Sequence, residues 1–200
     1  MSNPLATTYL GLELSSPLVV GAAAPLSSDP ARLEQLERDG AAAIVLHSLF
    51  LEQIERDWQE WEHHQRQGAE SYGEALSYLP ATEPVYLGLD GYLAEIREAR
   101  RRLSIPVIAS LNGTHPGHWR DAAAAVAAAG ADAIELNLYA VPSDGLCSGT
   151  EIEAEQLAVV REVCAAVTVP VAVSPSLSVA MTWTEPSAFR SSALRPVCSA

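Results

Sequence analysis

Short apolar runs alternate with longer stretches that repeat apolar residues at helical spacing along most of this chain. The runs occupy residues 18–24, 41–46, 105–113, 133–138 and 169–173. Continuous apolar runs of this length are typical of strands that are buried on both faces of a parallel sheet. The recurrence of such a run after each helical stretch therefore predicts about five strand–helix units in an α/β fold.

Helix signals separate the predicted strands. Ser28 or Asp29 followed by Pro30 predicts a helix start, and Gly40 predicts its end. Further helices are expected over residues 51–67, 90–103, 119–130 and 150–167. A closed barrel of this class needs eight strands, so the five predicted strands belong either to a smaller open sheet or to a chain that stops part-way through a barrel.

The two ends of the chain differ from this pattern. Residues 7–14 alternate around Gly11 and predict a small hairpin. Beyond residue 175 no helical or strand period remains, so we expect one α/β domain over residues 1–175 and an irregular tail over 176–200. Residues 50–89 form an irregular insertion after the second strand, which is a common place for a lid.

Composition excludes several classes of function. The net charge of -13 argues against a protein that binds nucleic-acid backbones. No apolar run is long enough to span a bilayer, so no membrane partner is expected. The cysteines at 147, 164 and 198 lack metal-ligand spacing and suit a reducing, cytoplasmic setting. His115 and His118 have no third ligand nearby in sequence, so no metal site is expected.

Polar residues interrupt the predicted strands at their carboxyl ends. Strand alternation places Glu135 and Asn137 on one face and Ile134, Leu136 and Leu138 on the other. Ligands of parallel α/β proteins bind at this edge, where an Asn amide can both donate and accept hydrogen bonds to a flat heterocycle. The alternative is that Asn137 merely ends a strand.

Taken in order, these segments resemble the N-terminal part of the dihydroorotate dehydrogenase family, more closely its dihydroorotate dehydrogenase-like branch. The resemblance runs from about residue 7 to residue 173. It is carried by YLGLEL at 9–14, PLVVGA at 17–22, IVLHSLF at 44–50, EQI at 52–54, PVIASLNG at 106–113, ELNL at 135–138 and VPVAV at 169–173.

This resemblance implies an FMN-dependent oxidoreductase of pyrimidine biosynthesis that converts dihydroorotate to orotate. The family fold is a (β/α)8 barrel with FMN at the carboxyl ends of the strands, where hydride passes to flavin N5 while a base removes a proton. The resemblance therefore implies that residues 1–175 form a partial (β/α)8 TIM barrel of about five strand–helix units. By position, the resemblance assigns flavin contacts to Ala22 and Ala23 and assigns Asn112 and Asn137 to the flavin or pyrimidine edge.

The same resemblance places His47 and Ser48 on the substrate side of the second strand, where the partner is a small pyrimidine. The family usually has lysine where this chain has His47. Its catalytic base falls on Ala140, which cannot accept a proton, so Ser143 and Cys147 in the same loop are the candidates to replace it. The fifth strand of the family reads Val-Lys-Leu-x-Pro, whereas here Val173 is followed directly by Ser174 and Pro175, so a second flavin-contacting lysine is absent.

Two functions therefore stay open. One is a dihydroorotate dehydrogenase-type enzyme whose chain is cut short, and the other is a non-catalytic scaffold or binding protein of the same fold. A barrel enzyme for a phosphate-bearing substrate is disfavoured, because no glycine-rich phosphate loop occurs in the strand–helix units. A partial barrel also leaves its fifth strand with an unpaired edge, so self-association is expected.

Overall fold

A five-stranded parallel sheet organises the described residues of the computed structural model, which are 3–51, 88–113, 119–139 and 148–175. The strands are neighbours in chain order: β3 (Val19–Val20), β4 (Ala43–Phe50), β5 (Val107–Asn112), β6 (Ala133–Leu138) and β7 (Val171–Pro175). Every adjacent pair is parallel. Strands that follow one another in this way form the wall of a (β/α)8 barrel, and the chain therefore forms a half-barrel.

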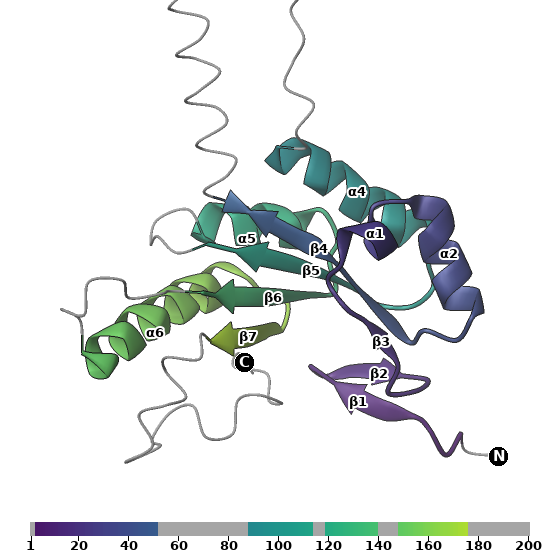
Figure 1. Ribbon diagram of the computed structural model, residues 1–200, viewed down its shortest axis with the longest axis horizontal. Helices are drawn as coiled ribbons and strands as arrows, with labels where there is room; N and C mark the ends of the chain where they lie inside the picture. Colours follow the sequence, from purple (N-terminus) through teal and green to yellow (C-terminus); the bar gives the residue numbers. More distant parts are fainter. Residues whose placement is uncertain (1–2, 52–87, 114–118, 140–147, 176–200) are drawn as a thin grey trace, which may run out of the picture.

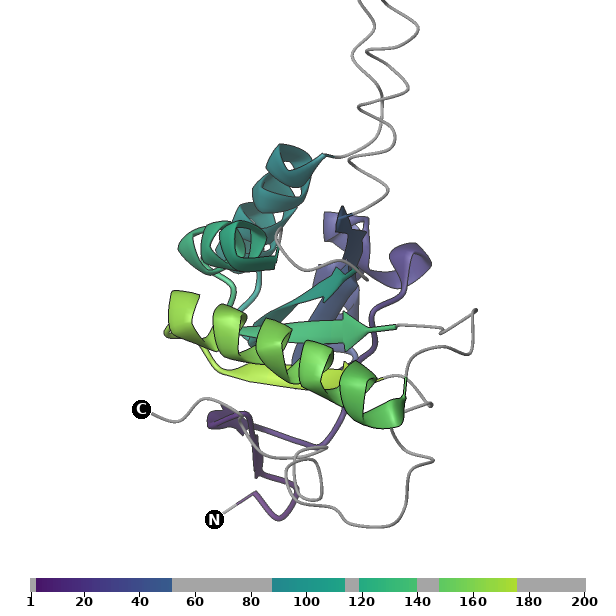
Figure 2. The ribbon, with the colours of Figure 1, turned by 90° about the vertical axis from the view of Figure 1, so that its left-hand side faces the viewer.

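Helices connect the strands and cover one face of the sheet. They are α1 (Ala24–Ser27), α2 (Pro30–Arg38), α4 (Leu89–Arg102), α5 (Trp119–Ala128) and α6 (Gly149–Ala166). Figure 2 shows α4, α5 and α6 following one another beside the strands. The opposite, concave face corresponds to the interior of a barrel. The predicted α/β partial barrel is thus confirmed.

The outer core lies between the strands and the helices. It contains alternate residues of the central strands, such as Ile134 and Leu136, packed with Tyr92 and Ile96 of α4 and with Val126 of α5. All of these side chains are fully buried. Burial of apolar area of this size is the main favourable contribution to folding.

Capping side chains and glycines mark the ends of the helices. The Asp29 carboxylate caps α2 by accepting from the Ala31 N–H at 3.0 Å. At the start of α6, Ser148 and Glu151 form a reciprocal capping box. Gly40 and Gly130 follow α2 and α5 with φ of 104° and 105°, a left-handed backbone that glycine adopts at little cost.

The predicted N-terminal hairpin is confirmed. Strands β1 (Thr7–Tyr9) and β2 (Leu12–Leu14) pair antiparallel around a turn formed by Leu10 and Gly11. Both turn residues have positive φ, 54° and 75°, which matches the twist of a tight hairpin. A positive φ is unfavourable for leucine, and burial of the Leu10 side chain offsets that cost.

The hairpin covers the bottom of the concave face. Its Leu10 and Leu14 pack against Val45, Ile108 and Ala133 in a second apolar cluster. Figure 1 shows the hairpin on the side of the arrow tails of β5, β6 and β7, at the amino ends of the strands. The concave face is therefore apolar and closed at the amino ends of its strands.

The first predicted strand is partly wrong. Residues 18–24 were expected to form a buried strand, but β3 contains only Val19–Val20, and Leu18 is 64% exposed. The strand is short because helix α1 begins at Ala24, with a proline in its first turn that cannot donate to a strand ladder. Within the described residues β3 pairs only with β4, so one edge of β3 has no strand partner there.

Other predictions lie outside the described residues. These are the insertion between residues 52 and 87, the pair His115 and His118, and the tail over 176–200. None of the described helices is long and apolar enough to cross a membrane. No group of three potential metal ligands occurs among the residues that the structure describes. Cys164 is disulfide-bonded. Disulfides are rare in the cytosol, so this bond does not support the predicted reducing, cytoplasmic setting, which stays a prediction.

Candidate functional site

Four polar side chains from three neighbouring strands meet on the concave face near the carboxyl edge of the sheet. They are Ser48 of β4, Ser110 of β5, and Glu135 and Asn137 of β6. The register places Ser48 beside Ser110 and Ser110 beside Glu135. Because parallel strands in register present equivalent positions to the same face, these side chains converge. We call this group the polar network.

Short hydrogen bonds connect the polar network. The hydroxyls of Ser48 and Ser110 lie 2.9 Å apart, and the Ser110 hydroxyl donates to Oε1 of Glu135 at 3.1 Å. Nδ2 of Asn137 donates to the Ser110 hydroxyl at 2.9 Å and to Glu135 at 3.1 Å. Ser110 and Asn137 are buried, so their polar atoms need these partners.

A bulge in β4 sets the position of Ser48. The ladder between β4 and β5 is regular to Val45 and resumes at Ser48, so the intervening residues are not matched one to one. At the resumed position the Tyr92 hydroxyl of α4 accepts from the Ser110 N–H at 3.0 Å and donates to the Ser110 carbonyl at 3.3 Å. The tyrosine thus provides the hydrogen bonds that β4 does not make at its bulge.

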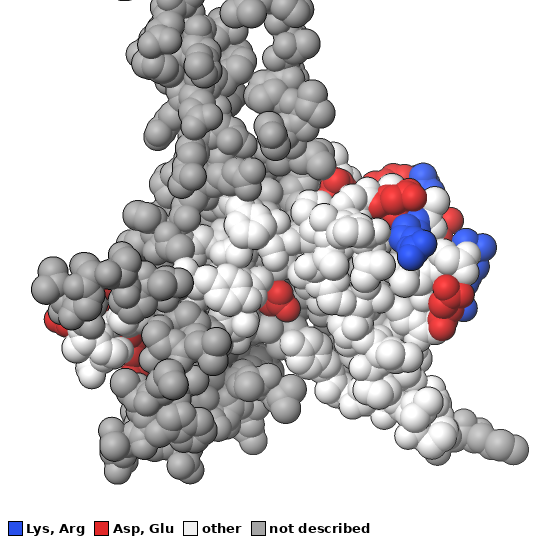
Figure 3. Space-filling view, viewed as in Figure 1, with Lys and Arg blue, Asp and Glu red and all other residues white. Residues whose placement is uncertain are grey.

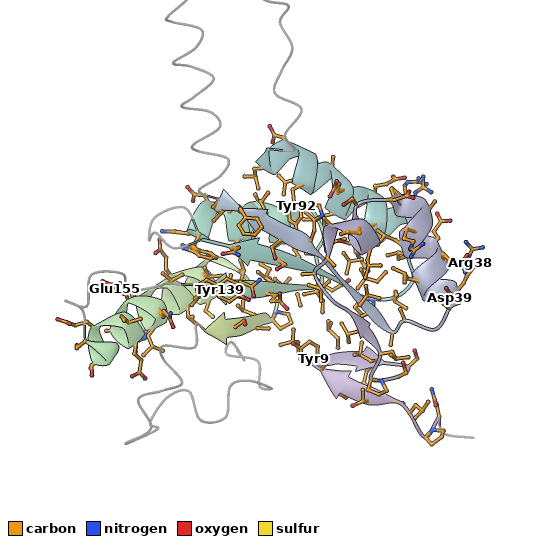
Figure 4. All side chains as sticks on the ribbon, in the orientation of Figure 1. Tyr9, Arg38, Asp39, Tyr92, Tyr139 and Glu155 are labelled. Carbon is orange, nitrogen blue, oxygen red and sulfur yellow. The ribbon has the colours of Figure 1, made fainter. Side chains whose placement is uncertain are left out.

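Below the polar network lies the apolar floor that the hairpin forms. Tyr9 belongs to this floor, and its pKa is raised by burial and, to a smaller extent, by the charge of Glu135. Figure 4 shows Tyr9 at the hairpin and Tyr139 near the opposite ends of the strands. The site therefore has an apolar closed end and a polar open end, the usual arrangement of ligand sites in parallel α/β folds.

Tyr139 follows β6 at this open end. Its hydroxyl lies 3.5 Å from Oδ1 of Asn137, a long and therefore weak hydrogen bond. The side chain is 48% exposed. A ligand bound next to Asn137 would thus contact the Tyr139 side chain, which this weak bond holds only loosely in place.

His47 lies apart from the polar network. Its ring packs edge-on against Tyr92, at 5.3 Å between ring centroids, and its Nδ1 is 3.6 Å from Oε2 of Glu95 on α4. Neither of these two atoms has a hydrogen-bond partner among the described residues. Burial lowers the pKa of His47 and raises the pKa of Glu95, so both shifts favour the neutral forms. The bulge therefore turns Ser48, and not His47, toward the concave face.

The helix layer contains a groove beside this histidine. The groove has a volume of about 260 Å³ and lies between α4 and the α1–α2 region, where Ser27, Leu33 and Glu95 are among its lining residues. Ser27 also accepts the His47 N–H at 2.8 Å through its hydroxyl. Figure 3 shows the charged residues gathered over α2 and the adjoining end of α4, while the central part of this view is largely uncharged.

The remaining predicted contacts are placed as follows. Asn112 is buried and is the register partner of Asn137 at the carboxyl edge, so the two predicted amides are neighbours. Ala22 is exposed and Ala23 half-buried, directly after β3. Ala140, Ser143 and Cys147 lie outside the described residues. The structure thus groups Asn112, Asn137 and Ser48, and their ligand contacts stay predictions.

Sequence reasoning missed the centre of the polar network. Ser110 looks like a small residue inside an apolar strand, yet it is fully buried and bonds to three network members. Its position two residues before Asn112 was a usable signal, because residues at that spacing face the same side of a strand.

Comparison with known proteins finds a distant likeness in structure and none in sequence. No family model matches the sequence, and no curated protein matches it. Among solved structures, the chain resembles an IMP dehydrogenase/GMP reductase-like protein from Corynebacterium glutamicum ATCC 13032 Kitasato, with 16% identity and a TM-score of 0.44. The likeness covers 85% of this chain but only 42% of that protein, and it does not assign a family.

Proposed function

We propose that this chain is part of an FMN-dependent oxidoreductase of the dihydroorotate dehydrogenase type, with a pyrimidine as substrate. The observation that supports it best is the polar network at the carboxyl edge of the half-barrel, above an apolar floor. The sequence resemblance assigns two of its members, Ser48 to the substrate and Asn137 to the flavin or pyrimidine edge. Geometry and resemblance therefore indicate the same edge of the sheet.

The chemistry of the side chains fits the flavin ring. A flavin is flat and mostly apolar, with a polar edge that accepts and donates hydrogen bonds. Asn112 and Asn137 offer amides to such an edge. The backbone after β3 leaves open space for a ring, because a Cβ built on Gly21 would meet no atom within 4 Å. FMN, when bound, supplies the hydride acceptor.

The phosphate of FMN needs a different part of the protein. The sequence has no lysine, since its twelve basic residues are all arginines. Every arginine that the structure describes lies on α2, α4, α5 or α6, outside the strands of the concave face. The phosphate would therefore bind backbone N–H groups or residues outside the described strands.

The alternative function is a non-catalytic scaffold of the same fold. It is favoured by the missing lysines and by alanine at position 140, where the resemblance expects a base. It is also favoured by His47, which contacts Tyr92 and lies near Glu95 in the helix layer. A scaffold would keep the polar network for ligand binding without transferring hydride.

The absorption spectrum of the purified chain after addition of FMN and gel filtration tests the proposal. We expect flavin to co-elute at close to one per chain, and Asn137→Ala to reduce the bound flavin at least about tenfold by removing a buried hydrogen-bonding group. Leu18→Ala serves as the control, since Leu18 is exposed and distant from the polar network in the sheet register.

A folded chain that retains no flavin at saturating FMN would contradict the proposal and favour the scaffold. Bound flavin that dihydroorotate does not reduce would support the cofactor part of the proposal and contradict dihydroorotate as the substrate.

A further inference from the structure

The polar network has a direction, because its hydrogen atoms can be assigned from the chemistry of its members. A carboxylate offers acceptors only. Glu135 as a carboxylate therefore requires donors from both atoms that contact its Oε1, the Ser110 hydroxyl at 3.1 Å and an Asn137 amide atom at 3.1 Å. The amide atom that faces Glu135 must be the NH₂ group.

This requirement fixes the orientation of the Asn137 amide. Its NH₂ group faces Glu135 and Ser110, inside the network. Its Oδ1 then points away from the carboxylate, and its recorded partner is the Tyr139 hydroxyl at 3.5 Å. The amide thus presents an acceptor at the open end of the site.

The same reasoning extends to Ser48. The single hydroxyl hydrogen of Ser110 is used by Glu135, so the contact of 2.9 Å between the two serines requires Ser48 to donate. The Ser48 oxygen then keeps lone pairs for a further partner. Nδ2 of Asn137 lies at 3.5 Å from it, too far for a strong bond.

We propose that Glu135 polarises this network so that Asn137 and Ser48 present hydrogen-bond acceptors to the ligand. The site then selects planar rings with an N–H donor edge, such as cyclic imides and lactams, over rings whose edge offers only acceptors. This inference rests on the proposed function, because it assigns the ligand to the same site. Glu135 acts in it as a positioning residue through Asn137 and Ser110.

Tyr139 has a defined part in this selection. Its hydroxyl is the only recorded donor to Oδ1 of Asn137 among the described residues, and the long distance makes the contact weak. The N–H group of a ligand replaces the tyrosine as donor and makes the shorter bond. An acceptor at the same position faces Oδ1 directly and is repelled.

Binding of two flavin rings tests the proposal. Lumiflavin has an N–H group at ring position 3, and 3-methyllumiflavin has none. We expect wild-type protein to bind lumiflavin at least about tenfold more tightly, the loss that follows when a buried acceptor is left without a donor. Glu135→Gln has nearly the same shape but allows the amides to reverse, so we expect the preference to fall below about threefold.

Glu155→Gln is the matched control, since Glu155 is an exposed residue of α6 (Figure 4). It should keep the wild-type preference. Equal binding of the two rings by wild type, or an unchanged preference in Glu135→Gln, would overturn the proposal while leaving flavin binding intact.

A measurement without ligand separates this inference from the proposed function. In ¹⁵N-labelled wild-type protein, the side-chain NH₂ of Asn137 should exchange slowly with solvent and shift strongly in Glu135→Gln but not in Glu155→Gln. If neither ring binds, the flavin proposal fails, and the NH₂ signals still test whether Glu135 sets the orientation of the Asn137 amide. Fast exchange of the Asn137 NH₂ in wild type would overturn the proposed orientation.

Discussion

Gly113 follows β5 at a position where the backbone and a tryptophan come very close. A Cβ built on this glycine would lie 3.0 Å from Cζ2 and 3.4 Å from Cε2 of Trp119. Trp119 begins α5 and is almost fully buried, so its ring has little freedom to move. Glycine at this position therefore allows the first turn of α5 to pack against the carboxyl end of β5.

We expect Gly113→Ala to destabilise the protein by about 1–3 kcal/mol, the usual cost of inserting a methyl group into packed surroundings. Urea unfolding followed by circular dichroism measures the change in the free energy of unfolding. Gly21→Ala is the control, because its added Cβ would meet nothing within 4 Å and its φ is not positive. Similar stability of the two variants would show that Trp119 can move aside.

At the residue scale, the sequence predicted which polar side chains lie close together better than it predicted the face of the sheet toward which each one points. Asn112, Asn137 and Ser48 lie together as their strand positions indicated. The direction of His47 could not be read from alternation, because the irregular register after Val45 breaks the period of two.

At the scale of elements, Tyr92 connects α4 to the interrupted ladder of β4 and β5. Its hydroxyl bonds both backbone groups of Ser110, and burial raises its pKa far above the usual range. We expect Tyr92→Phe to lower the free energy of unfolding by about 1–3 kcal/mol, because a buried N–H and a buried carbonyl lose their partner. Chemical unfolding measures this loss.

Tyr139→Phe provides the comparison for that variant. Its hydroxyl makes only the 3.5 Å contact and its side chain is half-exposed, so we expect a change within about 0.5 kcal/mol. Equal losses in the two variants would mean that the bonds to Ser110 add nothing specific to stability.

Glu37 joins α2 to the segment that leads into β5, and this contact depends on pH. Its carboxylate accepts from the Ser104 hydroxyl, from the Ser104 N–H at 2.9 Å and from the Ile105 N–H at 3.2 Å. The hydrogen bond from the Ser104 side chain is the main reason why the pKa of Glu37 is lowered from 4.5, and the two backbone hydrogen bonds lower it further.

Because the folded-state pKa is the lower one, this carboxylate stabilises the fold above the unfolded pKa and ceases to do so as pH falls through the folded value. We expect wild type to melt at a higher temperature than Glu37→Gln at pH 7, with the difference shrinking below about pH 4.5. Thermal melts of both proteins across this range measure it. A difference that grows on acidification would contradict the assignment.

Element boundaries were predictable where the sequence indicates a cap, as Asp29 does for α2. They were not predictable for β3, because an apolar run followed by alanines does not show that α1 begins at Ala24. The orientation of α6 was also partly missed. Helical spacing favours Leu157 as a core residue, but it is half-buried, while Gln156 and Val159 are buried instead.

For the whole molecule, the hairpin closes the amino end of the concave face. Leu14 is almost fully buried there against the strands. We expect Leu14→Ala to lower the free energy of unfolding by about 2 kcal/mol or more, through lost burial and the cavity that remains. Urea denaturation is the measurement, and Leu18→Ala, at an exposed position in the same region of the chain, should cost far less.

The strand order was the most predictable property of the whole molecule. Recurrent helix, small turn and apolar strand units predict parallel neighbours in chain order, and all five strands follow it. The closing role of the hairpin was not predictable, because alternation in residues 7–14 identifies a hairpin but not the surface it covers.

The irregular register of β4 also affects how this chain compares with others at the level of genes. Removing one codon between those for Val45 and Ser48 would restore a regular ladder, and β4 would then compete with Tyr92 for the backbone hydrogen bonds of Ser110. An alignment that places the gap for this extra residue at the wrong position pairs His47 with the residue of a relative that corresponds to Ser48. Distant relatives of this chain are therefore best aligned on Ser110 and Asn137, whose strands pair without interruption.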